Sequence, residues 1–254
     1  MLPSERQELI YKWVCEEKTL SLEDLSGRLN TSAMTIRRDL DLLQQEGMLK
    51  RVRGGAMTTD EPSTNFYFHQ RSQEYVEQKS AIAEFAAKNL VQDNDIILME
   101  GGTTVFMMAN HLKQSNLTIL TNGLCIISQL ASGPSNYTVM ASGGSVDYSE
   151  QIFIGPQAAS FFTNFRAHKC FLGADGLTLE DGATEANLAE NEVKRAMVQC
   201  AKETIILIDS HKIGSSSLVQ AINLDQIDTI VTDKGAPQDV LTGLQKKGIK
   251  VHIV

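Results

Sequence analysis

The chain has 254 residues, 42% of them hydrophobic and 21% charged, a composition typical of a globular protein with a full hydrophobic core. No apolar run approaches the roughly 18 residues of a membrane span, and residues 1–6 are too polar for a signal peptide, so we expect a cytoplasmic protein. The four cysteines are far apart in apolar stretches, which predicts no disulfide and no zinc site. We also expect no other metal and no cofactor.

The net charge of -8 argues against a nucleic-acid partner for the chain as a whole, but the charge is unevenly distributed. Residues 1–57 contain nine Lys and Arg and nine Asp and Glu, so the rest of the chain carries the whole negative charge. The first part is therefore neutral and the remainder acidic.

Three helices and a ribbon are predicted in the first 57 residues. The apolar positions that repeat at helical spacing are Leu9, Ile10, Trp13, Val14, then Leu22, Leu25, Leu29, then Ile36, Leu40 and Leu43. The third helix begins after the capping residues Asn30, Thr31 and Ser32 and ends near Gly47. Residues 48–57 alternate basic and apolar side chains around two glycines, which predicts a short β-ribbon, the wing of a winged helix-turn-helix domain.

Residues 58–75 are polar and irregular and predict a linker between this domain, residues 1–57, and a larger domain, residues 76–254. An amphipathic helix is expected over residues 79–93. Seven strand-like runs follow, mostly separated by helical or loop-length segments, which predicts an α/β domain with a largely parallel sheet. The runs are residues 96–99, 117–120, 138–140, 170–172, 204–208, 229–231 and 251–254.

The third helix has the character of a DNA-reading helix. With its apolar residues buried, a rotation of about 100° per residue turns Arg38 outward and places Thr35 and Arg37 on the flanks. Arginine at the start of such a helix can contact guanine or phosphate in the major groove. The candidate DNA contacts are Ser32, Thr35, Arg37 and Arg38, with Lys50, Arg51 and Arg53 on the wing. The alternative is that Arg37 and Arg38 merely pair with Asp39 and Asp41 on a solvated surface.

Residues 35–57, TIRRDLDLLQQEGMLKRVRGGAM, resemble the DeoR-type repressor family. In that family Thr, Ile, Arg, Arg, Asp and Leu open the recognition helix, and a basic segment ending in two glycines forms the wing. These features match residues 35–40 and 50–55. The resemblance continues across the second domain.

Polar turns follow several of the predicted strands. Gly102, Thr103 and Thr104 lie between a strand and a helix, where glycine backbone, hydroxyl groups and the helix N-terminus can bind an anion. Each such turn taken singly can also be purely conformational. Because loops at the carboxyl ends of parallel strands converge on one crevice, we expect five of these turns to line a single pocket. They are residues 100–104, 121–123, 142–144, 173–176 and 209–212.

These segments are similar to the effector domain of the DeoR-type family, which resembles ribose-5-phosphate isomerase in fold, and the resemblance implies a sugar-phosphate pocket. It assigns the phosphate turn to Gly102, Thr103 and Thr104, a basic partner to Lys79, the sugar-facing acid to Asp175 and a further cation to Lys212. Further family turns match Thr121, Asn122, Gly143 and Gly144. The helix containing Lys194 also fits the family. Glu100 and His211 depart from it, since Asp and Ser or Thr are usual there.

We therefore predict a repressor of a carbohydrate-utilisation operon, a homo-oligomer (dimer or tetramer) that binds operator DNA and is released by a phosphorylated sugar or similar metabolite. Three alternatives stay open. Asp175 and Lys212 could form only a partly buried ion pair. The larger domain, residues 76–254, could be a sugar-phosphate isomerase with Asp175 as general base, although residues 173–182 lack the lysine loop of such enzymes. It could also be an interaction scaffold without a ligand.

Overall fold

A computed structural model describes residues 3–45, 47–58, 66–132 and 136–254. The chain forms two compact units, Met1–Gln70 and Arg71–Val254. Their boundary lies within the stretch predicted as a linker, and residues 59–65 of that stretch lie outside the described residues. The rest of it is more regular than expected, because Phe66–Gln73 forms helix α4. Eight residues with one buried aromatic side chain, Phe68, are too few to show a helical period in the sequence.

The N-terminal unit contains the three predicted helices and the predicted ribbon. Its elements are α1 (Pro3–Glu17), β1 (Thr19–Ser21), α2 (Leu22–Leu29), α3 (Ala33–Gln45), β2 (Lys50–Val52) and β3 (Gly55–Met57). Strands β2 and β3 form the antiparallel wing, and β1 adds to its other edge in the order β1-β3-β2. The three-residue strand β1 was not predicted, because its pairing with β3 is a tertiary contact that no local pattern reveals.

The core of this unit is built from the apolar positions of its three helices, including Ile10, Leu25 and Ile36, which are all fully buried. The chain turns between α2 and α3 at Asn30, whose φ of 45° lies in the left-handed region. On the wing, Gly55 is required because a Cβ atom there would overlap the backbone of Leu20 in β1. These contacts fix α3 and the wing in one small domain.

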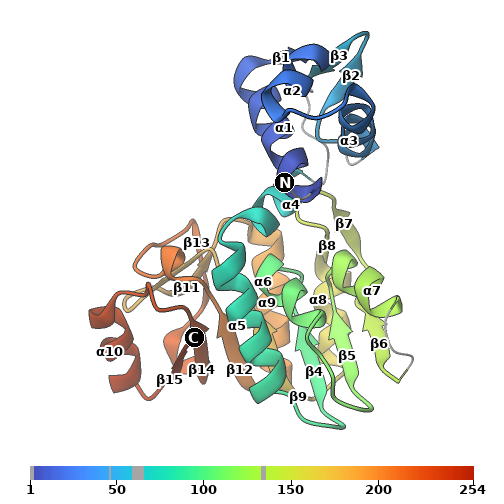
Figure 1. The fold of residues 1–254 in the computed structure, drawn as a ribbon. Coiled ribbons are helices and arrows are strands. Elements are labelled where there is room, and N and C mark those ends of the chain that lie inside the picture. The colour runs from blue at the N-terminus through green and yellow to red at the C-terminus, as the bar shows by residue number, and fades with distance from the viewer. Residues whose placement is uncertain (1–2, 46, 59–65, 133–135) are drawn as a thin grey trace. The chain divides into compact units, whose positions relative to one another are not determined.

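The C-terminal unit is built on a seven-stranded sheet in the order β15-β14-β12-β9-β4-β5-β6 (Figure 1). Its strands are β4 (Ile96–Met99), β5 (Thr118–Thr121), β6 (Thr138–Ala141), β9 (Ala167–Leu172), β12 (Ala201–Leu207), β14 (Thr229–Thr232) and β15 (Lys250–Ile253). Every neighbouring pair is parallel. All seven predicted strands are confirmed, and with them an α/β domain.

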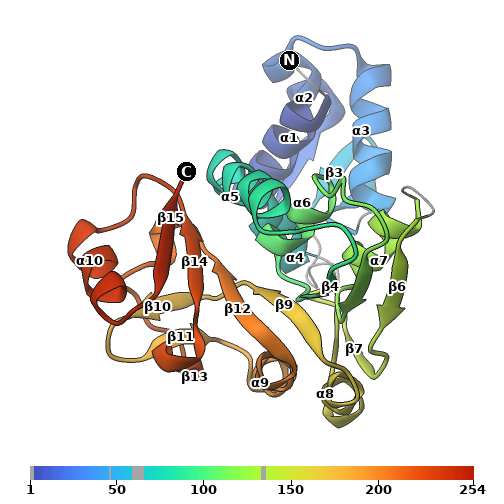
Figure 2. The ribbon, with the colours of Figure 1, turned by 90° about the horizontal axis from the view of Figure 1, so that it is seen from below.

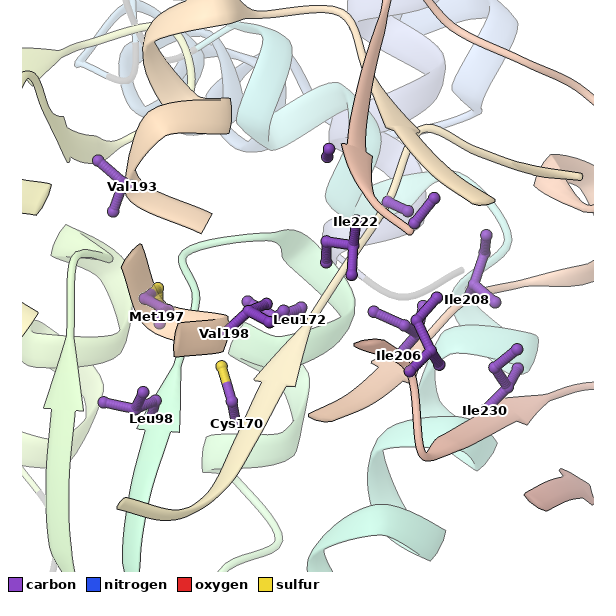
Figure 3. Packing of buried hydrophobic residues seen from close by; sticks show 14 of the residues in the cluster. Leu98, Cys170, Leu172, Val193, Met197, Val198, Ile206, Ile208, Ile222 and Ile230 are labelled. Carbon is purple, nitrogen blue, oxygen red and sulfur yellow. The ribbon is translucent and has the colours of Figure 1, made fainter. Parts of the chain in front are cut away.

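Helices cover both faces of this sheet, as Figure 2 shows. One face is covered by α5 (Val76–Asn89), α6 (Thr103–Ala109) and α7 (Leu124–Ala131), and the other by α8 (Pro156–Thr163), α9 (Leu188–Cys200) and α10 (Gln238–Lys246). Successive strand residues alternate between the two faces, so that Ile97 packs with the first set and Leu98 with the second. Figure 3 shows the hydrophobic cluster on the face covered by α8, α9 and α10, where Met197 and Val198 of α9 pack near Cys170 of β9.

Two small antiparallel sheets and two short 3₁₀ helices complete the unit. They are β7 (Ser145–Asp147) with β8 (Ile152–Ile154), β10 (Gly176–Thr178) with β11 (Gly182–Glu185) and β13 (Val219–Ile222), and the helices η1 (Ser210–Lys212) and η2 (Leu224–Gln226). None of these short elements was predicted. Within the described ranges no helix is long and apolar enough to cross a membrane.

The strand order places a switch point between β4 and β9. From β4 the chain proceeds to β5 and β6 on one side, and it then returns to β9 on the other side before proceeding to β12 and β14. Loops at the carboxyl ends of the strands separate at such a point and leave a crevice in which open α/β sheets bind ligands.

Candidate functional site

Helix α3 presents its basic side chains to solvent. Ile36, Leu40 and Leu43 are buried as predicted, and Arg37 and Arg38 are exposed. The helix is capped by Ser32, whose Oγ accepts a hydrogen bond from the Thr35 amide at 3.2 Å. That Oγ also lies 2.9 Å from the Thr35 hydroxyl oxygen, so both predicted polar contacts stand together at the start of the helix.

The acidic residues of α3 are engaged elsewhere. Asp39 is buried and accepts hydrogen bonds from Arg6 at 2.6 and 3.1 Å and from Gln7 at 3.1 Å. Asp41 forms an ion pair with Arg51 of the wing. Among the described residues neither Arg37 nor Arg38 forms an ion pair, so the alternative in which they pair with these aspartates does not match the geometry.

The wing presents two of its three predicted cations freely. Lys50 and Arg53 are exposed. Arg51 is held against α3, since it pairs with Asp41 and its amide donates to the Gln44 side chain at 2.8 Å. Among the described residues, the wing therefore offers two cations without an ion pair, Lys50 and Arg53, and one that is partly neutralised, Arg51.

A polar pocket lies in the C-terminal unit at the switch point of the sheet. The turns after β4, β9 and β12 contribute most of its wall, and α9, the last residue of β11 and the end of α4 contribute the rest. The residues that line it are Arg71, Glu100, Gly102, Thr103, Thr104, Gly173, Ala174, Asp175, Glu185, Glu190, Lys194, Leu207, Ile208, Asp209 and Lys212. Three of the five predicted turns thus converge on one site.

The turn after β4 is shaped by its glycines. A Cβ atom at Gly101 would overlap the Ile152 side chain, and one at Gly102 would crowd the carboxylate of Glu100. Gly102 precedes α6, which no side chain caps, and Thr103 and Thr104 form its first turn. The Gly101 amide donates to Asn122 Oδ1 at 3.1 Å, which fixes the turn from the neighbouring strand end.

A buried ionic cluster forms the deep wall of the pocket. Lys194 Nζ donates to Glu185, lies 3.1 Å from Glu190 Oε1 and 3.9 Å from Glu100 Oε1, and all four residues are buried. Burial opposes the charge on Lys194, but the three carboxylates outweigh it and raise the pKa of Lys194. Burial also raises the pKa of Glu100 and of Glu185, which favours a proton within the cluster. Glu190 and Lys194 are four residues apart on one helix, a spacing at which an ion pair can form.

Asp175 stands at the mouth of the pocket between two cations. Arg71 Nη1 lies 3.3 Å from Asp175 Oδ1, and Lys212 Nζ lies 3.7 Å from the same oxygen. Lys212 also donates to the Ala174 carbonyl at 2.9 Å. Burial opposes ionisation of Asp175, but these cations outweigh it and lower its pKa. The ion pair considered as an alternative for Asp175 and Lys212 is therefore present, and both residues still line the pocket.

Arg71 links the pocket to α4. It pairs with Glu150, between β7 and β8, as well as with Asp175. No sequence signal pointed to Arg71, because it lies in the stretch read as a linker, or to Glu150, which lies between two strands too short to predict.

Lys79 is buried and is not among the residues that line the pocket. Its Nζ donates to the Arg71 carbonyl, and it forms no ion pair among the described residues. Burial and the nearby charge of Lys212 lower the pKa of Lys79 to about 8. Lys79 thus lies near the predicted cation Lys212, and among the described residues its Nζ forms no hydrogen bond to the predicted phosphate turn.

Two predicted turns do not reach the pocket, so the expectation that all five line it was wrong for them. Thr121 and Asn122 are fully buried: the Thr121 hydroxyl accepts from the Gly123 amide, and the Asn122 side chain accepts from the Gly101 amide and donates to the Phe153 carbonyl. Gly143 and Gly144 follow β6, two strands from β4, where both take positive φ. Strand ends converge only near the switch point, and these turns lie on one side of it.

A winged helix-turn-helix domain and a separate α/β domain with a polar pocket define the class of two-domain DNA-binding regulators that respond to a small molecule. Residues 6–61 match the DeoR-like helix-turn-helix domain, and residues 74–234 match the DeoR C-terminal sensor domain. The chain belongs to the DeoR family of transcriptional regulators.

Full-length relatives agree with this assignment. The chain is 33% identical to the HTH-type transcriptional regulator GolR of Listeria innocua, over 100% of this chain and 99% of the relative. It is 32% identical to a putative aga operon transcriptional repressor of Escherichia coli O157:H7, over 99% of this chain and 94% of the relative. These relatives are transcriptional regulators and not enzymes, which removes the isomerase alternative.

Among solved structures, ribose 5-phosphate isomerase from Plasmodium falciparum is similar with a TM-score of 0.40 and 14% identity, over 54% of this chain and 52% of that chain.

Proposed function

We propose that this protein represses a carbohydrate-utilisation operon and leaves its operator when a phosphorylated sugar or related metabolite occupies the pocket at the switch point. The pocket carries this proposal. It combines Lys212 and the uncapped turn of Thr103 and Thr104, which suit a phosphate, with carboxylates such as Asp175, which suit sugar hydroxyls. The Escherichia coli relative is named a putative operon transcriptional repressor, and this supports repression rather than activation.

Arg71 supplies a route from ligand to DNA. It occupies the last turn of α4, and it is held by Glu150 and Asp175 through its side chain and by Lys79 through its carbonyl. A ligand that binds Asp175 or attracts Lys79 competes with these bonds and so changes how α4 is held. Ligand and DNA then favour different states of the same segment, the condition for coupling.

Operator binding with and without ligand tests the proposal. DNA selected from a random pool by the purified protein serves as operator, and its affinity is measured by fluorescence anisotropy at fixed salt with a panel of sugar phosphates and their unphosphorylated counterparts. We expect one phosphorylated compound to weaken DNA binding at least fivefold and to raise the melting temperature of the protein.

Matched variants assign the effect to the pocket. Lys212→Met should abolish the response, and Lys246→Met, at an exposed lysine on α10, should preserve it. Arg71→Gln should bind the ligand and yet couple ligand binding to DNA binding only weakly. The control Arg166→Gln, at an exposed arginine between α8 and β9, should couple them normally. If the protein binds DNA and no compound alters either measurement, the body is a scaffold and the proposal fails.

A symmetric dimer or tetramer is part of the proposal, because two heads on one operator need two-fold symmetry. Analytical ultracentrifugation of the full chain tests it, and a monomer at micromolar concentration would contradict it.

A further inference from the structure

Asp209 is a buried carboxylate that nothing in the described part of the chain satisfies. It follows β12 and lines the pocket, with a side chain that is 1% exposed. Neither of its oxygens has a hydrogen-bond partner among the described residues. A buried charge without partners costs free energy, and buried polar groups are nearly always bonded. The group therefore invites a functional explanation.

The nearest cations are engaged elsewhere. Lys212 Nζ donates to the Ala174 carbonyl, and Lys79 Nζ donates to the Arg71 carbonyl. His211 Nδ1 lies 3.7 Å from Asp209 Oδ1, beyond hydrogen-bonding distance, and its ring stacks on Tyr75 with centroids 3.5 Å apart. Asp209 thus has positive charge nearby and no donor in contact.

The corresponding acid of the next strand shows what a structural aspartate looks like here. Asp233 follows β14 and is also buried. It accepts hydrogen bonds from the amide and hydroxyl of Ser210, at 2.6 and 2.8 Å, and from the Gly235 amide at 3.0 Å. The same position at the end of a neighbouring strand is fully bonded, so the unbonded state of Asp209 is not a general property of these strand ends.

We infer that Asp209 accepts hydrogen bonds from the effector itself, and that the effector therefore carries a hydroxyl or ammonium donor in addition to its phosphate. This inference rests on the proposed function. Lys212 and Asp209 lie at the two ends of η1, so one ligand can place its anionic group near Lys212 and its donor on Asp209. The pocket then selects a polyhydroxylated or amino-substituted phosphate over a phosphate without donors.

Ligand binding to wild type and Asp209→Asn tests the inference, with Asp239→Asn at an exposed position of α10 as control. The probes are glucose 6-phosphate, glucosamine 6-phosphate, ribose 5-phosphate, glycerol 3-phosphate and inorganic phosphate, each titrated by calorimetry. We expect Asp209→Asn to lose about 10-fold to 100-fold in affinity for the sugar phosphate that binds wild type best. Its affinity for inorganic phosphate should be unchanged. A hydroxyl donor gives the smaller loss and an ammonium donor the larger, because only the ammonium also loses its ion pair.

Two further measurements keep the test decisive. Without ligand, Asp209→Asn should melt at a higher temperature than wild type, because it removes an unpaired buried charge. On wild type, the deoxy analogue that lacks the donor should bind about 10-fold to 100-fold more weakly than the parent compound, and this comparison needs no variant to fold.

The outcomes separate the two proposals. If wild type binds a sugar phosphate and Asp209→Asn and the deoxy analogues bind equally well, Asp209 has no ligand role and the proposed function stands. If wild type binds none of the probes and none releases it from DNA, the proposed function fails and this inference fails with it.

Discussion

The two units of this protein place their charged residues in opposite ways. In the N-terminal unit, which we call the head, the carboxylates of α3 form internal ion pairs with Arg6 and Arg51, while Arg37 and Arg38 face solvent. In the C-terminal unit, which we call the body, charged residues line the pocket at the ends of parallel strands, and Lys194 is buried there. The head is thus suited to a large polyanion that approaches from solvent, and the body to a small ligand that enters a preformed polar site.

The difference also explains the charge of the chain. In the neutral N-terminal unit, the α3 surface is locally basic because Asp39 is buried and Asp41 is paired with Arg51, so the net charge of -8 does not oppose DNA binding. In the C-terminal unit, burial makes an unpaired charge costly, and Lys194 is paired there with Glu185 and Glu190.

The largest effect is expected where a charge is buried most completely. Lys194→Met leaves three carboxyl groups without their cation, so we expect a loss of about 3–5 kcal/mol in the free energy of unfolding at pH 7, measured by urea denaturation. The loss should shrink as the pH falls from 7 to 5. Unpaired buried carboxyl groups have raised pKa values, so the folded variant binds more protons than the unfolded chain and gains stability at low pH.

The exposed lysine variant Lys246→Met is the control and should change stability by less than about 0.5 kcal/mol. A loss below about 1 kcal/mol for Lys194→Met would mean that the cluster is not held by its ion pairs.

In the head, the reverse result is expected: a large effect on binding and little on stability. Arg37→Ala and Arg38→Ala should each weaken operator binding by about 1–3 kcal/mol, because both side chains are exposed on the recognition helix. Thermal unfolding should shift little. Lys12→Ala, an exposed cation on α1, should bind DNA nearly as well as wild type. If both arginine variants bind like wild type, α3 is not the reading helix.

The same contrast decides how much of the molecule could be predicted. The N-terminal unit could be predicted because its core positions, such as Ile36 and Leu40, repeat at helical spacing, and the residues predicted to contact DNA lie between them. The seven strands of the large sheet could be predicted because each is an apolar run in the sequence. What local patterns could not give is which strands are neighbours, and strand order determines which turns meet.

The pocket shows this limit residue by residue. Thr104, Asp175 and Lys212 were predicted and line it, whereas Asn122 was predicted and supports the Gly101 turn from behind. Arg71 was missed because its partners, Glu150 and Asp175, lie 79 and 104 residues away in the sequence. Such contacts exist only in the folded chain.

A smaller effect is expected at the wing, where the two ways of using charge meet in one ion pair. Asp41→Asn frees Arg51 and removes a negative charge from α3, so operator affinity should rise, by less than about 1 kcal/mol for an exposed pair. The double variant Asp41→Asn with Arg51→Ala should lose this gain if it arises through Arg51. Glu16→Gln on α1 is the matched control. No gain in Asp41→Asn at low salt would show that the ion pair positions Arg51 for DNA rather than withholding it.

The smallest expected effect is the uptake of a fraction of a proton when the ligand binds. Lys79, with a pKa of about 8, is about half protonated at pH 8. A phosphate bound near Lys79 favours its charged form and raises that pKa, so binding should take up as much as about half a proton at pH 8 and much less at pH 6, where Lys79 is already protonated. Calorimetry of the sugar phosphate that releases DNA, in buffers of different ionisation enthalpy, measures this uptake. Lys79→Arg stays charged at both values and should abolish it. Equal uptake in wild type and Lys79→Arg would place the phosphate away from Lys79, and the buried lysine would then serve to hold Arg71 alone.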